Sequence, residues 1–364
     1  AWEQRKLGEL VDVCSGRDYK HLSEGDIPVY GTGGYMLSVS EALSYDKDAI
    51  GIGRKGTIDK PYILNAPFWT VDTLFYAIPK EKVDLNFAFD IFQNINWKKK
   101  DESTGVPSLS RTAINEIHIL VPQYDEQQVL GQLFYGIDRL IALHQRKLDK
   151  MKELKKAFLN LIFSQKLRFY GFTDSWELRK LEEVAPLRGG YAFQSNQYAN
   201  EGIPIVRISN ILSDGSVGGE FVFHNELKDD EIFMLENGDI VLAMSGATTG
   251  KVSILSSEKS CKYYQNQRVG LFSKTATCNY SFVATIVRSE KFLEQLRDVL
   301  VAGAQPNVSA KDIDAFDFSV PKDVEEQSQI GNFFRTLDRL ITLYQKKIDS
   351  SKEMKKILLK NMLI

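Results

Sequence analysis

The chain has 364 residues, of which 43% are hydrophobic and 26% are charged, and its formal net charge is −2. This length suits two globular units better than one core, and this composition excludes a disordered or fibrous protein. No apolar run approaches the roughly 18 residues of a membrane span, and Cys14, Cys261 and Cys278 form no Cys-x-x-Cys pair, so we expect a cytoplasmic protein without signal peptide, disulfides, zinc module or membrane contact.

Basic residues are unevenly distributed along the chain. Residues 1–122 and 171–321 carry net charges of −3 and −6, whereas residues 123–170 and 322–364 carry +4 and +3. A DNA-binding protein with this balance would neutralise phosphates through local patches or through a partner protein. Charge alone therefore neither predicts nor excludes DNA binding.

Residues 1–122 and 168–321 alternate short β-branched and aromatic runs with Gly, Ser, Asn and Asp turns, which is typical of strands. Each stretch is therefore predicted to be a globular domain of mixed α and β structure. Strands are expected at 27–30, 68–76, 117–121, 203–208, 239–244 and 268–272, and helices at 85–95 and 290–301.

Residues 123–167 and 322–364 predict two long helices of closely similar sequence. Residues 126–163 align without gaps on 326–363, with about 17 of 38 positions identical, and 38 helical residues span about 57 Å. Apolar residues, or residues that tolerate burial, recur every three to four positions, and no proline intervenes. Each helix therefore has one face to bury. We expect the two copies to pack antiparallel on each other; the alternative is that each packs on its own domain. The predicted buried positions are Leu130, Phe134, Ile137, Ile141, His144, Leu148, Met151, Phe158 and Ile162, and in the second copy Ile330, Phe334, Leu337, Ile341, Tyr344, Ile348, Leu358 and Met362.

The duplication extends beyond the helices. Trp2-Glu3-Gln4-Arg5-Lys6-Leu7 returns as Trp176-Glu177-Leu178-Arg179-Lys180-Leu181, and Pro107-Ser108-Leu109-Ser110 returns as Pro306-Asn307-Val308-Ser309. Between such anchors the halves diverge. The predicted fold is therefore α+β, with a pseudo-twofold internal repeat of two mixed domains separated by two long helices.

Several glycine-rich or amide-rich loops are candidates for DNA contact. Gly51–Thr57 places two cations among glycines, where arginine could bind phosphate or guanine; the alternative is an exposed hairpin turn. Gln265-Asn266-Gln267-Arg268 offers groups that recognise adenine and guanine edges, although these amides could equally satisfy backbone groups. The predicted DNA-contacting residues are Tyr30, Thr32, Gly33, Arg54, Lys55, Thr57, Lys99, Ser108, Arg111, Arg188, Tyr191, Arg207, Ser245, Thr248, Thr249, Lys251, Gln265, Asn266, Gln267, Arg268 and Asn307.

No catalytic or metal site is predicted. The segment Ser245–Val252 resembles a phosphate-binding loop, but its glycines are one residue too close and Val252 has no hydroxyl for magnesium. His21, His118, His144 and His224 show no ligand spacing or triad pattern. Asn65-Ala66-Pro67-Phe68 lacks one proline of an adenine-methyltransferase turn. We therefore expect no enzyme activity in this chain itself.

Taken together, these strings resemble the specificity subunit of type I restriction-modification systems. The resemblance rests on Trp-Glu-x-Arg-Lys-Leu opening each half, on Ile27–Tyr35, on Gly238–Val252, and on the Asp-Arg-Leu-Ile helices. It covers essentially the whole chain. Because residues 167–172 precede Trp176 whereas only Ala1 precedes Trp2, we also expect the natural chain to begin earlier.

The resemblance implies a function in DNA recognition. Domains 1–122 and 168–321 would each recognise one half of a bipartite, asymmetric target in double-stranded DNA, and the helices at 123–167 and 322–364 would set the spacer. Two methyltransferase subunits, with S-adenosylmethionine, would dock on the chain, and two restriction subunits, with ATP and magnesium, would complete the complex. This chain would hold no cofactor. The alternative is a standalone DNA methyltransferase or nuclease.

Overall fold

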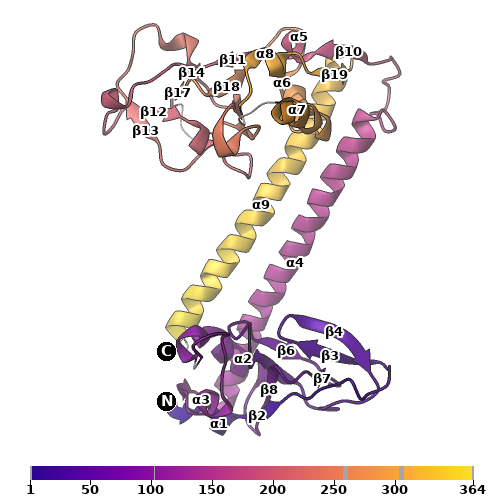
Figure 1. Ribbon diagram of the computed structural model, residues 1–364, viewed down its shortest axis with the longest axis vertical. Helices are drawn as coiled ribbons and strands as arrows, with labels where there is room; N and C mark the ends of the chain where they lie inside the picture. The colour runs from indigo at the N-terminus through magenta and orange to yellow at the C-terminus, as the bar shows by residue number, and fades with distance from the viewer. Residues whose placement is uncertain (1, 102, 257–260, 303–306, 363–364) are drawn as a thin grey trace. The chain divides into compact units, whose positions relative to one another are not determined.

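The computed structural model describes residues 2–101, 103–256, 261–302 and 307–362. It divides into two compact units (Figure 1). Unit 1 consists of Ala1–Leu148 together with Leu343–Ile364, and unit 2 consists of Asp149–Thr342. Each unit therefore combines one strand-rich segment with parts of both long helices. Both long helices are thus divided between the two units, although each helix is one continuous segment of the sequence.

The described residues of unit 1 form three β-sheets. A two-stranded sheet pairs β1 with β9, and a four-stranded antiparallel sheet has the order β2-β8-β5-β6. A third sheet has the order β4-β3-β7, in which β3 is antiparallel to β4 and parallel to β7. The strands are β1 Glu3–Lys6, β2 Val11–Ser15, β3 Ile27–Gly31, β4 Gly34–Val39, β5 Ala49–Gly53, β6 Tyr62–Leu64, β7 Trp69–Thr70, β8 Leu74–Pro79 and β9 His118–Val121. The short helices are α1 Leu7–Leu10, α2 Leu85–Asn94, η1 Trp97–Lys100 and α3 Arg111–Asn115.

Unit 2 repeats this plan. Its sheets have the orders β10-β19, β11-β18-β15-β16 and β13-β12-β17-β14. The strands are β10 Glu177–Lys180, β11 Leu187–Gly189, β12 Ile203–Val206, β13 Val222–His224, β14 Met234–Leu235, β15 Ile240–Ala243, β16 Val252–Ile254, β17 Tyr263–Gln265, β18 Val269–Phe272 and β19 Asp317–Val320. The short helices are α5 Leu181–Val184, η2 Ser195–Gln197, η3 Ile208–Asn210, η4 Asp230–Ile232, η5 Gly246–Thr248, α6 Tyr280–Ile286, α7 Glu290–Ala302 and α8 Ala310–Asp314.

The predicted mixed α and β fold with an internal repeat is thus confirmed, and the repeat continues through segments whose sequences have diverged. Strand by strand, β2-β8-β5-β6 corresponds to β11-β18-β15-β16, and β4-β3-β7 corresponds to β13-β12-β17. Among the described strands, the one in unit 2 without a counterpart in unit 1 is β14, at one edge.

The central strands are continuously apolar because both faces of their sheets are covered. In β5, Ile50 and Ile52 enter one core while Ala49 enters another. In β15, Ile240 and Leu242 enter one core while Val241 and Ala243 enter another. Side chains alternate between faces along a strand, so each strand needs apolar residues at every position.

Two expected strands differ in the structure. The run at 68–76 forms two strands, β7 and β8, because Val71–Thr73 turn between them. The run at 203–208 ends as a strand at Val206, where the chain enters η3. Helix α6 was not expected, since Tyr280–Ile286 has no strong apolar period. No helix in the described part of the chain is long and apolar enough to cross a membrane.

The long helices are α4, Tyr124–Phe163, and α9, Val324–Met362 (Figure 1). In unit 1 the ring of His144 packs on Tyr344, with centroids 5.7 Å apart, and Lys355 contacts Asp138. In unit 2 Lys155 contacts Asp338, and Phe158 packs on Phe333. In both units the partner number falls as the residue number rises, so the helices are antiparallel. The predicted apolar stripes are buried or half-buried throughout.

A buried glutamine near the start of each long helix ties it to the strand-rich part of its unit. Gln127 donates to the Pro122 carbonyl (2.9 Å) and accepts from the backbone N–H of Asp84 (3.1 Å), the N-cap of α2. Gln327 donates to the Pro321 carbonyl (2.8 Å) and accepts from the Asn279 N–H (2.7 Å) at the start of α6. Both side chains are almost fully buried, so each amide must be bonded.

A glycine one turn later lets the N-terminus of the short helix approach the long helix. A methyl group at Gly131 would lie 2.8 Å from the Phe87 nitrogen in α2, and one at Gly331 would lie 2.5 Å from the Ser281 carbonyl carbon in α6. Real side chains do not approach backbone this closely, so only glycine fits. The same contact therefore occurs in both units.

A lysine–aspartate pair joins the two long helices in each unit, and the lysine of unit 1 is buried and also reaches a short helix. In unit 1 Lys355 of α9 contacts Asp138 of α4 (2.6 Å) and Gln93 of α2 (2.5 Å), with Asp90 at 3.8 Å. In unit 2 Lys155 contacts Asp338 (2.5 Å), which also accepts from Arg288 (3.0 Å). The lysine–aspartate pair is therefore repeated.

Gly331→Ala should lower the midpoint of thermal unfolding, because the new methyl group would overlap the start of α6. Overpacking of this kind costs about 1–3 kcal/mol. The matched control is Gly136→Ala in α4, where a methyl group meets nothing within 4 Å, and which should gain about 1 kcal/mol of helix propensity. Circular dichroism melts of both variants check this, and equal behaviour of the two would contradict it.

The pH dependence of stability should respond to Asp90. Burial raises the pKa of its carboxyl to about 8, while Lys355 opposes the rise and the Asp138 and Asp84 carboxylates add to it. Because this value exceeds the ordinary 3.8, the folded chain holds a proton that the unfolded chain releases, and stability falls as pH rises towards 8.

Asp90→Asn should therefore unfold at a higher temperature than the wild type at pH 9, and at a similar temperature at pH 4. Asp46→Asn, at an exposed position, is the control and should leave the pH profile unchanged. A difference between Asp90→Asn and wild type that is the same at both pH values would rule out this explanation.

Candidate nucleic-acid interface

Four loops of unit 1 meet beside the β2-β8-β5-β6 sheet; we name residues 15–17, 54–57, 70–73 and 107–111 cluster 1. Backbone hydrogen bonds hold the loops together. The bonds are Arg17 N to Thr70 O (2.8 Å), Arg54 N to Thr73 O (2.8 Å), Gly56 N to Pro107 O (2.8 Å) and Leu109 N to Arg54 O (2.9 Å). Segments that are distant in sequence are thus joined into one surface by backbone hydrogen bonds.

Cluster 1 presents four exposed cations, which are Arg17, Arg54, Lys55 and Arg111. Arg54 donates to the Asp72 carbonyl (3.4 Å), and Arg111 donates to the Ser15 hydroxyl (3.1 Å). Burial raises the pKa of the Tyr76 hydroxyl, and the positive charges of Arg17 and Arg111 oppose that rise. This density of cations is suited to phosphate or guanine.

Glycines shape the 54–57 turn. A methyl group at Gly53 would overlap the Thr57 carbonyl, and Gly56 has a φ of +85°. The turn therefore closes tightly, with Arg54 and Lys55 at its exposed corner. This geometry fits both the predicted DNA contact and its alternative, an exposed hairpin turn, so contact with DNA stays a prediction.

The equivalent loops of unit 2 form cluster 2, defined as residues 189–191, 244–249, 265–268 and 307–309. The same kinds of bond join them. They are Tyr191 N to Gln265 O (2.8 Å), Met244 N to Arg268 O (3.0 Å) and Val308 N to Met244 O (2.9 Å), with a strand-like bridge between Ser245 and Asn307. The backbone arrangement of cluster 1 is therefore repeated.

The side chains of cluster 2 differ in chemistry from those of cluster 1. Gln267, Arg268, Tyr191 and Asn307 are exposed, and Asn266 and Ser245 are half-buried. This set offers amides, a hydroxyl, an aromatic ring and a single guanidinium. Such groups form hydrogen bonds with base edges rather than a dense positive patch. Gln305 and Pro306, part of the motif that precedes Asn307, lie outside the described residues.

Three predicted contact residues of unit 2 bond to the protein itself. Gln265 is fully buried and donates to the carbonyls of Arg188 (2.9 Å) and Val269 (2.7 Å). Arg188 donates to the carbonyls of Ile232 and Met234, and Arg207 donates to that of Glu220. Gln265 thus satisfies backbone groups, which is the alternative given for these amides from the sequence.

The remaining hydroxyls and the lysine of the 245–252 segment also have protein partners. Thr248 donates to the Ile208 carbonyl (3.2 Å), Thr249 to the Gly246 carbonyl (2.6 Å) and Lys251 to the Ser213 hydroxyl (2.8 Å). These bonds brace the segment against η3. In this structure the segment forms a braced turn beside Ser245.

Predicted residues of unit 1 outside the first cluster lie in two places. Tyr30 begins the turn that contains Thr32 and Gly33 between β3 and β4, and its carbonyl accepts from Val71 (3.0 Å), which links this hairpin to cluster 1. Lys99 is exposed on η1, beside a surface hollow of about 340 Å³ that Glu116 also lines. Lys99 takes no part in the bonds that join the four loops.

The sequence prediction missed Arg17. Arg17 lies as many residues after Trp2 as Tyr191 lies after Trp176, so the two residues are equivalent in the repeat. Both residues directly follow a glycine. The internal repeat, applied residue by residue to the predicted Tyr191, would have identified Arg17.

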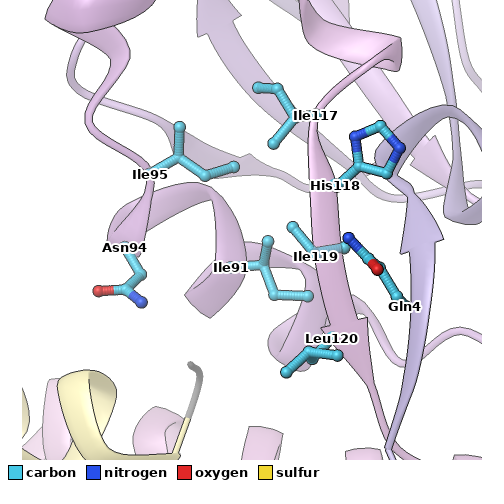
Figure 2. A pocket seen from close by; sticks show the side chains of 8 residues that line it. All are labelled: Gln4, Ile91, Asn94, Ile95, Ile117, His118, Ile119 and Leu120. Atoms are coloured by element: carbon cyan, nitrogen blue, oxygen red, sulfur yellow. The ribbon is translucent and has the colours of Figure 1, made fainter.

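A separate hollow of about 220 Å³ lies in unit 1 between α2 and the β1–β9 pair (Figure 2). Its lining is largely isoleucine and leucine, with the side chains of Gln4, Asn94 and His118 at its edge. No carboxylate belongs to the described residues that line it, and no group of three possible metal ligands occurs anywhere in the described ranges. This hollow therefore offers no paired acid and base.

Residues 1–153 and 173–351 match the family model of the type I restriction modification DNA specificity domain. The chain belongs to this family. Its two specificity-domain matches coincide with the two copies of the fold, so the family pattern and the internal repeat describe the same duplication.

Curated relatives carry consistent names. The MjaVIII specificity subunit of Methanocaldococcus jannaschii, a type I restriction enzyme subunit, is 24% identical over 277 residues, covering 71% of this chain and 64% of the relative. The EcoAI specificity subunit of Escherichia coli is 24% identical over 230 residues, covering 61% and 38%. This specificity-domain chain thus spans less than two thirds of the length of either relative.

Solved structures resemble the whole fold. The S subunit of a type I restriction-modification system from M. genitalium superposes with a TM-score of 0.77 at 15% identity, covering 100% of this chain and 96% of that one. A chain from a study of complex assembly and conformational transition in a type I system gives 0.50 at 12% identity, covering 99% and 96%. At these identities the likeness establishes that this specificity-domain chain shares their fold.

Within this specificity-domain chain, the same substitution should destabilise the protein at Gln265 but not at Gln267. Gln265→Glu would direct a buried carboxylate at two carbonyl oxygens, so its thermal midpoint should fall, with a loss of about 2–4 kcal/mol. Gln267→Glu, two residues away and exposed, should leave stability within about 0.5 kcal/mol. Melting curves of the two variants provide the check, and a stable Gln265→Glu protein would show that the buried amide is dispensable.

Proposed function

We propose that this chain is a DNA specificity subunit in which cluster 1 and cluster 2 each recognise one half of a bipartite target. One observation supports the proposal above all. The same four-loop backbone arrangement occurs twice, on frames that share Gln127/Gln327 and Gly131/Gly331, yet the exposed side chains differ. Repeated frames with unlike contact groups suit two different half-sites.

The chemistry of the clusters favours an asymmetric target. Cluster 1 carries four exposed cations, whereas the exposed groups of cluster 2 are mainly amides and an aromatic ring. Arginine pairs best with guanine, and glutamine and asparagine pair best with adenine. The two half-sites therefore differ in sequence, and the long helices set an unread gap between them.

The net charge of −2 limits what the chain does alone. Nonspecific affinity for DNA rises with the number of phosphates neutralised, and the clusters supply few cations for this. We infer that methyltransferase subunits enclose the DNA and contribute much of the phosphate binding. They also carry S-adenosylmethionine and the catalytic groups, while restriction subunits use ATP and magnesium.

The competing function is a standalone methyltransferase or nuclease. Incubation of the pure chain with labelled S-adenosylmethionine and DNA separates the two. Our proposal expects methyl transfer only after the methyltransferase partner is added. Mapping of the methylated adenines should then reveal two short specified segments separated by a fixed gap, and transfer by the pure chain would favour the alternative.

Arg54→Ala and Arg268→Ala should each weaken binding to one half-site only. Loss of a bidentate base contact costs about 1–3 kcal/mol. Binding titrations with duplexes altered in one half-site at a time, in the presence of the methyltransferase, measure the effect. The control is Arg5→Ala in β1, whose side chain pairs with Glu9 on the surface. Equal losses on unrelated sequences would identify phosphate contacts instead.

The copied helices offer a surface for two identical partners. Arg139-Leu140 and Leu143 on α4 return as Arg339-Leu340 and Leu343 on α9. Leu140, Leu143 and Leu343 are each more than 40% exposed, although leucine is normally buried. Two copies of one partner require two copies of one surface, which the exposed Leu143 and Leu343 offer.

Leu143→Lys should remove one methyltransferase subunit from the complex, and Leu143→Lys with Leu343→Lys should remove both. Val129→Lys is the matched control, because Val129 is more exposed (67%) but its counterpart is Gln329. Native mass spectrometry counts the bound subunits. Full occupancy in the double variant would place the docking surface elsewhere.

A further inference from the structure

The end of β7 and the loop after β2 make an unusually close contact in unit 1, and the contact is repeated in unit 2. A methyl group at Gly16 would overlap the carbonyls of Thr70 and Val71, and one at Gly190 would overlap those of Gln265 and Asn266. No side chain fits either position. The two glycines therefore fix the same bend in both units.

The residue after each glycine is held by the same hydrogen bond. Arg17 N donates to Thr70 O at 2.8 Å, and Tyr191 N donates to Gln265 O at 2.8 Å. Both side chains are nevertheless exposed, with Tyr191 at 46%. Positions 17 and 191 thus combine a fixed backbone with an accessible side chain, which is the arrangement that precise recognition requires.

The Arg17 guanidinium is accessible to a ligand, because the side chain is exposed. In the described part of the chain its guanidinium makes no hydrogen bond or ion pair, although the carboxylates of Asp18 and Asp72 are exposed on the same loops. It shares cluster 1 with three other cations, and like charges gathered together cost stability. An acceptor-rich ligand would relieve that cost.

Tyr191 is positioned by two other rings. Its centroid lies 4.9 Å from that of Phe193 and 4.8 Å from that of Phe233, and both phenylalanines are buried. The ring is therefore largely immobilised before any ligand binds, so little conformational entropy remains to be lost. Its exposed edge offers apolar carbon and one hydroxyl.

We propose that Arg17 and Tyr191 occupy one equivalent specificity-determining position, where Arg17 contacts a guanine in one half-site and Tyr191 contacts a thymine methyl group in the other. This inference rests on the proposed function. Arginine matches the paired O6 and N7 acceptors of guanine, and an apolar surface matches the thymine methyl in the major groove. The two contacts then account for part of the asymmetry of the target.

The test is selection from duplexes with randomised positions by the full chain assembled with its methyltransferase partner, followed by sequencing. Arg17→Ala should lower the preference for guanine at one base pair by roughly 5- to 150-fold and leave the other half-site unchanged. Arg17→Gln should move that preference to adenine. Tyr191→Ala should lose a thymine preference in the other half-site, whereas Tyr191→Phe should keep it.

Matched controls are Arg5→Ala and Tyr170→Ala, since Tyr170 is fully exposed and lies before β10; both should reproduce the wild-type preferences. If Tyr191→Ala unfolds at a lower temperature, Tyr191→Gln keeps most of the side chain and should move the same base pair towards adenine. Unchanged preferences in the Arg17 and Tyr191 variants would overturn the proposal. A uniform loss across all sequences would also overturn it, because it would mark phosphate contacts.

Failure of the proposed function looks different. In that case the wild-type assembly itself selects no sequence from the library. Alternatively, the wild-type assembly could select a clear bipartite sequence while the variants select the same bases. That result would leave the proposed function standing and remove only the roles of residues 17 and 191.

Discussion

The contact between a buried glutamine, a glycine and the N-terminus of a short helix governs how each strand-rich part joins the long helices. Gln127 and Gln327 each bond the end of a strand segment and the start of α2 or α6. The amide is buried, so a shift of either element leaves polar groups unpaired at a cost of about 1–3 kcal/mol each. Gly131 and Gly331 remove the side chain that would keep the elements apart. Together these residues fix the position of the loops relative to the helix.

The residues that fix the loops are distinct from the residues that the loops expose. This separation explains which positions are alike in the two halves of the sequence and which differ. Residues that hold the frame, including Asp138/Asp338 and Lys155/Lys355, are copied because the joint is copied. Loop residues such as Lys55 and Ser245 are free to differ, because the bonds that place them run between backbone groups. A frame of this kind tolerates new contact groups without a new fold.

Much of the fold was predictable, because helix periodicity and internal repetition are properties of sequence alone. The long helices, their buried stripes and the helix at 85–95 follow directly from spacing. Helix α6 was missed because its place is set by the contact with Gly331, which is remote in sequence. For the candidate interface, composition located the loops but did not show which side chains are exposed and which are bonded to the protein. Gln265 and Gln267 look alike in sequence, yet one bonds the backbone inside the protein and the other faces solvent.

The make-up of unit 1 bears on how the chain acquires its structure during synthesis. Leu358, Leu359 and Met362 complete a core whose other members, such as Phe87 and Phe134, are made more than 200 residues earlier. Lys355, which neutralises Asp138, arrives equally late. The strand-rich segment of unit 1 therefore carries an incomplete core until residues 355–362 have been made, whereas every residue of unit 2 lies within one continuous stretch. Contacts this distant in sequence form slowly, so unit 2 is able to close while unit 1 still awaits its last helix, and the exposed apolar surface of unit 1 needs protection during that interval.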